Sequence, residues 1–159
     1  MKLPSDWIKQ LDQIRDSGGA SINLLLTKQC QYQCAHCMFR SGPKEPSLYM
    51  SYDVLLQIFE FARQLREIGL VVGYNMVGGE PTLNMSRFKF ICDIMEQHVY
   101  EDQIEMTTNG WWLRHTDNIV KFVNAVGFLT LKDQLRSIRI SDSTFHSTWR
   151  SDKAATRVK

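Results

Sequence analysis

Apolar side chains recur along the chain with the periods of helices and strands. Residues 5–17 carry them at helical spacing, and Gly18 and Gly19 supply a stop. Residues 22–26 form a short apolar run that is typical of a buried strand. Residues 28–49 contain glycine and proline and keep no steady period, which predicts a long loop. Loops of this length are usually functional, so this loop is the first candidate site.

The alternation of strand and helix continues beyond this loop. Ser51 and Thr116 are suited to cap the first and third of the helices that follow, and Gly69 and Gly127 to end them. The predicted later strands are residues 70–77, 103–107 and 136–140. The predicted helices between the strands are residues 51–69, 85–99 and 116–127. The side chains expected to face inward from the last two helices are Phe88, Ile91, Cys92, Met95, Ile119, Val120, Val123 and Val126.

Strands that alternate with helices in this way predict an α/β fold. The strands should form a parallel sheet, joined by right-handed crossovers that place helices on its face. A chain of 159 residues fits one domain. Within it we expect an N-terminal helix at 1–20, a core at 21–147 and a polar C-terminal tail at 148–159.

Composition and charge narrow the class of protein. Hydrophobic residues make up 43% of the chain, which is enough for a packed core. A formal net charge of +2 is too small to indicate nucleic acid or a membrane surface as the partner. The N-terminus lacks the apolar core of a secretory signal, and the longest apolar runs are too short to span a bilayer. We therefore expect a cytoplasmic protein.

Three of the four cysteines lie close together in the long loop, directly after the first strand. Cys30, Cys34 and Cys37 are clustered as metal or cluster ligands are, whereas a disulfide scaffold would spread them out. Three thiolates from one loop can hold three irons of a four-iron cluster and leave the fourth iron open for an exchangeable ligand. The alternative is a zinc site that adds His36. Adjacent residues seldom both bind one tetrahedral ion, and no second pair of ligands is evident in the sequence.

The C-x-x-x-C-x-x-C spacing resembles the signature of the radical S-adenosylmethionine (radical SAM) superfamily. The resemblance implies that the three cysteines hold a [4Fe–4S] cluster, whose open iron binds S-adenosylmethionine. An electron from the reduced cluster would cleave this cofactor to a 5′-deoxyadenosyl radical, which abstracts a hydrogen from a substrate. An external electron donor of the flavodoxin or ferredoxin type is implied as well.

Three polar or glycine-rich motifs follow the later strands, where ligands bind in parallel α/β folds. By the resemblance, the Gly-Gly-Glu-Pro motif receives the amino group of the cofactor, and Glu80 can pair with an ammonium. On composition alone Asn109-Gly110 would simply be a turn, and Asp142 could cap a helix. The residues that the resemblance assigns to S-adenosylmethionine are His36, Gly78, Gly79, Glu80, Pro81, Thr107, Asn109, Ser141 and Asp142.

The family core has about six strand–helix units, and only four are found here. We therefore expect an incomplete, partial TIM-like barrel that lacks its C-terminal units. A naturally minimal enzyme, a fragment, a truncated gene product and a core completed by a partner chain all stay open. So do two other functions, a non-catalytic iron–sulfur or zinc binding module and an activase of glycyl-radical enzymes. The substrate, a small molecule or a peptide, is not specified.

Overall fold

A computed structural model describes residues 5–17, 19–99 and 103–141 of the chain. Its strands are β1 (Ala20–Leu25), β2 (Val72–Val77), β3 (Ile104–Thr108) and β4 (Leu135–Ile140). Its helices are α1 (Ser5–Asp16), α2 (Tyr52–Glu67), α3 (Met85–His98), the 3-10 turn η1 (Trp111–Arg114) and α4 (Thr116–Leu131). The predicted elements are all present, with boundaries within about two residues except at the end of α4. Asp142 and the tail at 148–159 lie outside the described residues.

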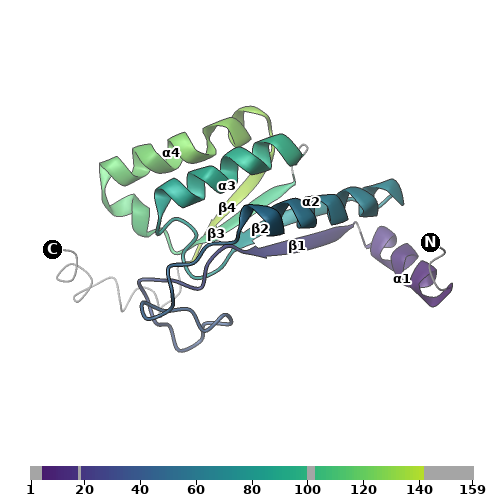
Figure 1. The fold of residues 1–159 in the computed structure, drawn as a ribbon, viewed down its shortest axis with the longest axis horizontal. Helices are drawn as coiled ribbons and strands as arrows, with labels where there is room; N and C mark the ends of the chain where they lie inside the picture. The colour runs from purple at the N-terminus through teal and green to yellow at the C-terminus, as the bar shows by residue number, and fades with distance from the viewer. Residues whose placement is uncertain (1–4, 18, 100–102, 142–159) are drawn as a thin grey trace.

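The four strands form one sheet in which every pair is parallel. Their order in space, β1-β2-β3-β4, is also their order in the sequence. Helices α2, α3 and α4 cover one face of this sheet, as right-handed crossovers require (Figure 1). The α/β class with a partial barrel is therefore confirmed. Among the described residues β1 and β4 are the two edges, so the barrel is not closed.

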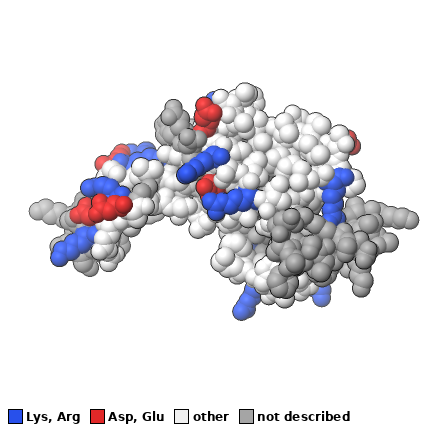
Figure 2. Space-filling model, turned by 180° about the vertical axis from the view of Figure 1, so that it is seen from behind, with Lys and Arg blue, Asp and Glu red and all other residues white. Residues whose placement is uncertain are grey.

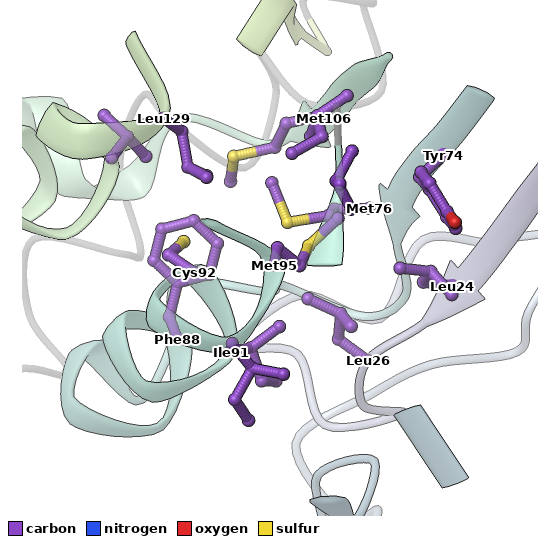
Figure 3. Packing of buried hydrophobic residues seen from close by; sticks show 14 of the residues in the cluster. Leu24, Leu26, Tyr74, Met76, Phe88, Ile91, Cys92, Met95, Met106 and Leu129 are labelled. Carbon is purple, nitrogen blue, oxygen red and sulfur yellow. The ribbon is translucent and has the colours of Figure 1, made fainter. Parts of the chain in front are cut away.

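The core lies between the sheet and these three helices. Leu24, Met76 and Met106 are paired across neighbouring strands and are fully buried. Phe88 and Leu129 reach the same layer from α3 and α4 (Figure 3). Alternate residues of each strand point the other way, because successive side chains of a strand face opposite sides of the sheet.

Helix α4 differs from the prediction in its buried face and in its end. Its buried side chains are Phe122, Ala125, Val126 and Leu129, whereas Val120 and Val123 are more than half exposed. This segment is apolar on two faces, and the stacking of Phe122 on Trp112, with ring centroids 3.8 Å apart, shows which face packs inward.

The helix also continues through Gly127 to Leu131. A glycine inside a helix costs only about 1 kcal/mol, so it does not have to end one. The left-handed residue that follows the helix is Asp133, with a φ of 51°. It takes the place that the sequence suggested for Gly127, since Asp is one of the few residues that tolerate this conformation.

The face of the sheet opposite the helices is polar. Asn75 donates its side-chain amide to Asn23 at 3.1 Å, and Arg139 pairs with Glu105 at 2.7 Å. The view from behind shows charged side chains scattered among uncharged ones, without a block of one sign (Figure 2). In the part of the chain that the structure describes, no helix combines the length and apolar character needed to cross a membrane.

Candidate functional site

The two ends of the cysteine loop are joined to each other. Thr27 forms an isolated bridge with Tyr49, and Gln29 forms one with Gly42. The amide of Cys30 also donates to the Gly42 carbonyl at 3.2 Å. These contacts close a long segment that has no helix or strand of its own.

The three cysteines line one cavity of about 250 Å³ between this loop and the strand ends. Nine of the twelve residues predicted for the site contribute to its wall. They are Cys30, His36, Cys34, Cys37, Gly78, Gly79, Thr107, Asn109 and Ser141. Glu80 and Pro81 are close by but do not line it, and Asp142 lies outside the described residues. The fold thus brings together segments that are far apart along the chain.

The wall also contains residues that the sequence did not assign to the cofactor. Val77 and Thr108 flank predicted residues at the ends of β2 and β3, so proximity to the motifs could have identified them. Tyr32, Met38 and Phe39 come from the cysteine loop, where no periodic pattern shows which side chains turn inward.

Two glycines bring the end of β2 against the cysteine loop. Gly78 has a φ of 147°, and a Cβ there would lie 2.5 Å from the carbonyl oxygen of Thr27. A Cβ on Gly79 would lie 2.1 Å from the Gln29 carbonyl oxygen. Both positions need glycine because the chain approaches itself, and the two segments are joined there by the Gly79 amide, which donates to Thr27 at 2.7 Å.

Glu80 is fully buried and lies behind the cavity wall. Its Oε1 accepts from the hydroxyls of Thr82 and Thr108 at 2.6 and 2.8 Å, and from the Thr82 amide at 3.1 Å. Its Oε2 accepts from the Asn109 amide at 2.8 Å. Burial raises the pKa of Glu80, and these donors oppose the rise. In this geometry the carboxylate fixes the turn after β3.

The cysteine thiols differ in their surroundings. Burial raises the pKa of Cys30 to about 12, and raises that of the more open Cys34 by less. Backbone amides donate to two of the sulfurs, Tyr32 to Cys30 and Ser41 to Cys37, each at 3.4 Å. Such donors favour the thiolate, the form in which cysteine binds iron or zinc. Three thiols around one cavity, two of them with amide donors, are a donor set that fits an iron–sulfur cluster.

Within the described ranges, no three His, Cys, Asp or Glu side chains form a group that could hold a metal ion in this structure.

Comparisons with known proteins agree with the geometry. The model of the family described as "Radical SAM superfamily" matches residues 24–133, from the first strand to the turn before the fourth. The chain belongs to the radical SAM superfamily. The matched region contains the cysteine loop and the motifs after β2 and β3, so the signature motifs and the family model agree on the same segment.

Several curated proteins are similar to this chain. A "GTP 3′,8-cyclase" of Helicobacter pylori is 28% identical over 124 residues, which are 75% of this chain and 36% of that protein. A "Putative peptide biosynthesis protein" of Bacillus subtilis is 29% identical over 93 residues, 58% of this chain and 27% of that protein. An "S-adenosylmethionine-dependent nucleotide dehydratase" of Fibrobacter is 28% identical over 109 residues, which are 67% of this chain and 32% of that protein. The chain thus spans about a third of the length of these relatives.

Proposed function

We propose that this chain binds a [4Fe–4S] cluster through Cys30, Cys34 and Cys37, and S-adenosylmethionine at the open iron. The observation that carries the proposal is the convergence of the three thiols and three strand-end motifs on one cavity. In a parallel α/β fold this carboxyl edge is where ligands bind. The reaction would be reductive cleavage of S-adenosylmethionine to a 5′-deoxyadenosyl radical that takes a hydrogen atom from a substrate.

When bound and reduced, a cluster held by the three cysteines would supply the electron needed to cleave S-adenosylmethionine into methionine and the 5′-deoxyadenosyl radical. The chain's own residues have other tasks. The cysteines would hold the metal, and the aromatic rings of Tyr32 and Phe39, which line the cavity, would limit the access of water. Ser141 lines the cavity directly after β4, and its hydroxyl would bond the cofactor together with Asp142. Since each turnover consumes an electron, an external donor of the flavodoxin or ferredoxin type completes the proposal.

The remaining residues of the cavity wall suit the polar groups of S-adenosylmethionine. Gly78 and Gly79 present backbone rather than side chains to the cavity, which suits the amino group of the methionine moiety. Thr107 and His36 lie on other parts of the same wall, and in this proposal they would contact the nucleoside. Because the carboxylate of Glu80 faces Thr108 and Asn109, its contribution would come through the backbone of its motif and through the turn that it fixes.

The substrate stays open. Relatives with 28–32% identity carry names that refer to GTP, to peptide biosynthesis and to nucleotides, so the names do not agree on one class. The parts of those proteins that this chain does not match make up about two thirds of their length. A partner chain that covers the open edge at β4 is one way in which the site could be completed.

The test is anaerobic reconstitution with iron and sulfide, followed by S-adenosylmethionine and dithionite. We expect about four irons per chain and formation of 5′-deoxyadenosine. Cys34→Ala should lose both. Cys92→Ala is the matched control. Cys92 is buried in α3, so its substitution should leave the iron content unchanged.

The outcomes separate the candidate functions. Equal amounts of 5′-deoxyadenosine from the wild-type and Cys34→Ala proteins would refute the role of the cysteine loop. A loaded cluster without cleavage would leave an iron–sulfur binding module. Stoichiometric zinc without iron would replace the cluster by a zinc site.

A further inference from the structure

Asn109 touches a cluster ligand directly. Its side-chain Nδ2 lies 3.7 Å from Sγ of Cys30, within hydrogen-bonding range for sulfur, and both residues are buried. The two residues come from different parts of the fold, since Cys30 follows β1 and Asn109 follows β3. In this structure Asn109 is therefore more than a residue of the cavity wall.

The orientation of the Asn109 amide is fixed by its neighbours. The backbone amide of Trp111 donates to Oδ1 of Asn109 at 3.1 Å, and Nε2 of Gln31 donates to the same oxygen at 3.1 Å. A backbone N–H can only donate, so the atom facing Trp111 must be the oxygen. The nitrogen then faces Cys30. The Asn109 backbone is held in turn by its bond to the buried Glu80 carboxylate.

Asn109 is also distinct from the other donors to the cysteine sulfurs. Tyr32 and Ser41 donate through their backbone amides. Among the hydrogen bonds between described residues, Asn109 provides the side-chain donor, and none of these bonds reaches the Cys34 sulfur. Cys30 thus receives two donors, and one of them can be removed by a substitution outside the cysteine loop.

We propose that Asn109 is a positioning residue that raises the reduction potential of the cluster through its hydrogen bond to Cys30. The inference rests on the proposed function, since it requires the cluster. Reduction adds negative charge that the sulfurs share, and an N–H donor stabilises the more negative state more strongly. Hydrogen bonds to the sulfurs are among the factors that set the potentials of such clusters. The protein would use this bond to make the cluster easier to reduce.

The experiment is a redox titration of the reconstituted protein, followed by electron paramagnetic resonance, without S-adenosylmethionine. Asn109→Ala removes the donor without adding charge. Asn109→Asp keeps the size, the turn and an oxygen that faces Trp111, and also removes the donor. Both variants should titrate at a more negative potential. We expect about a tenfold lower ratio of reduced to oxidised cluster at fixed potential, ~59 mV for a one-electron couple.

Trp111→Phe is the matched control. It removes the indole N–H that donates to Thr82 at 2.9 Å but keeps the backbone N–H that orients Asn109. Its potential should equal that of the wild-type protein. A potential unchanged in both Asn109 variants at full iron content would overturn the inference, and weaker S-adenosylmethionine binding in the same variants would then assign Asn109 to that cofactor alone.

A second measurement applies if the variants assemble no cluster. Wild-type protein labelled with ¹⁵N in its asparagine side chains should show a weak ¹⁵N coupling to the reduced cluster in pulsed electron paramagnetic resonance. Absence of that coupling would also overturn the inference. Failure of the wild-type protein itself to take up iron would instead contradict the proposed function.

Discussion

At the scale of single residues, Glu80 shows how a buried charge can serve the fold. Its carboxylate accepts four hydrogen bonds. Two come from the backbone amide and the hydroxyl of Thr82, one from the Thr108 hydroxyl and one from the Asn109 amide. A buried carboxylate is tolerated when its oxygens are satisfied in this way. The bonds tie the motif after β2 to the turn after β3, so one side chain sets the relative position of two walls of the cavity.

Glu80→Gln should therefore destabilise the protein. The substitution keeps the shape but replaces an acceptor oxygen by an NH₂ group, which would face a donor. Hydrogen bonds to charged groups contribute about 1.5–3 kcal/mol, and we expect a loss of that size in the free energy of unfolding. Urea denaturation followed by circular dichroism measures it.

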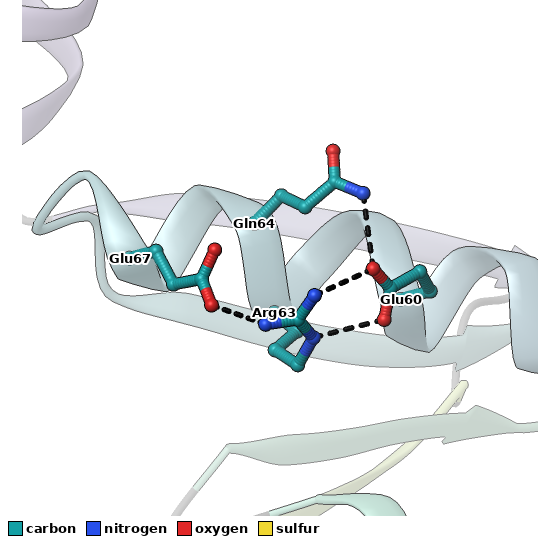
Figure 4. A network of polar contacts seen from close by, with 4 residues as sticks. All are labelled: Glu60, Arg63, Gln64 and Glu67. Carbon is teal, nitrogen blue, oxygen red and sulfur yellow. Dashed lines mark hydrogen bonds and ion pairs between the residues drawn. The ribbon is translucent and has the colours of Figure 1, made fainter.

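Glu60→Gln is the matched control for this experiment. Glu60 lies on the exposed side of α2, where it pairs with Arg63 at 2.7 Å and Arg63 also pairs with Glu67 (Figure 4). The hydrogen bonds that Glu60 accepts from Arg63 and Gln64 lower its pKa to about 2. Solvent screens exposed ion pairs, so the urea concentration at the midpoint of unfolding should be the same for this control as for the wild-type protein. Equal losses in both variants would contradict the role assigned to Glu80.

The cysteines should react with iodoacetamide in an order set by their environment. The thiolate is the reactive form, and burial raises the pKa of Cys30 to about 12 and that of Cys34 by less. At pH 8 metal-free protein should be alkylated at Cys34 before Cys30. The Cys30 rate should rise with pH and reach no plateau below pH 12, because less than half of the thiol is ionised below its pKa. Peptide mass spectrometry measures both, and faster labelling of Cys30 at pH 8 would disagree with this structure.

At the scale of elements, contacts between the chain's own segments explain which glycines the site requires. Gly78 and Gly79 lie where the end of β2 meets the cysteine loop, with no room for a Cβ at either position. Gly127 lies inside α4, and a Cβ there would meet nothing within 4 Å. The same residue type is thus essential at the edge of the sheet and replaceable in the helix.

Alanine at these two kinds of position should act in opposite directions. Gly79→Ala forces its Cβ against the Gln29 carbonyl and should cost about 1–3 kcal/mol, together with cluster binding. Gly127→Ala should raise the stability by about 0.5–1 kcal/mol, since alanine loses less conformational entropy in a helix. Thermal unfolding of both variants measures the difference. Destabilisation by Gly127→Ala would contradict the continuous course of α4.

At the scale of the whole molecule, the sheet formed by the described residues has two central strands and two edges. Strands β2 and β3 lie in the centre and are paired on both sides, and their alternate residues are buried. Strand β4 pairs on one side among the described residues, and most of its residues are exposed. Helix α1 extends away from the sheet (Figure 1). Stability should therefore decrease from the centre of the sheet toward its edges.

Hydrogen exchange should reproduce this order. Amides of β2 and β3 should exchange slowest, because they open only with the core, and those of β4 and α1 fastest. Mass spectrometry of peptides after deuterium labelling gives the ranking. Protection of β4 equal to that of β2 would indicate that something further covers the edge.

The sequence by itself determined the order and type of the elements, the parallel sheet and the place of the cysteine loop. These features follow from local periods and from motifs at strand ends, which act over a few residues. The tertiary structure decided the rest. The buried face of α4 depends on the stacking of Phe122 on Trp112. The role of Glu80 depends on its hydrogen bond with Thr108. The contact of Asn109 with Cys30 joins residues that are 79 positions apart. No local pattern records such contacts, because they form only when packing brings distant strand ends to one edge.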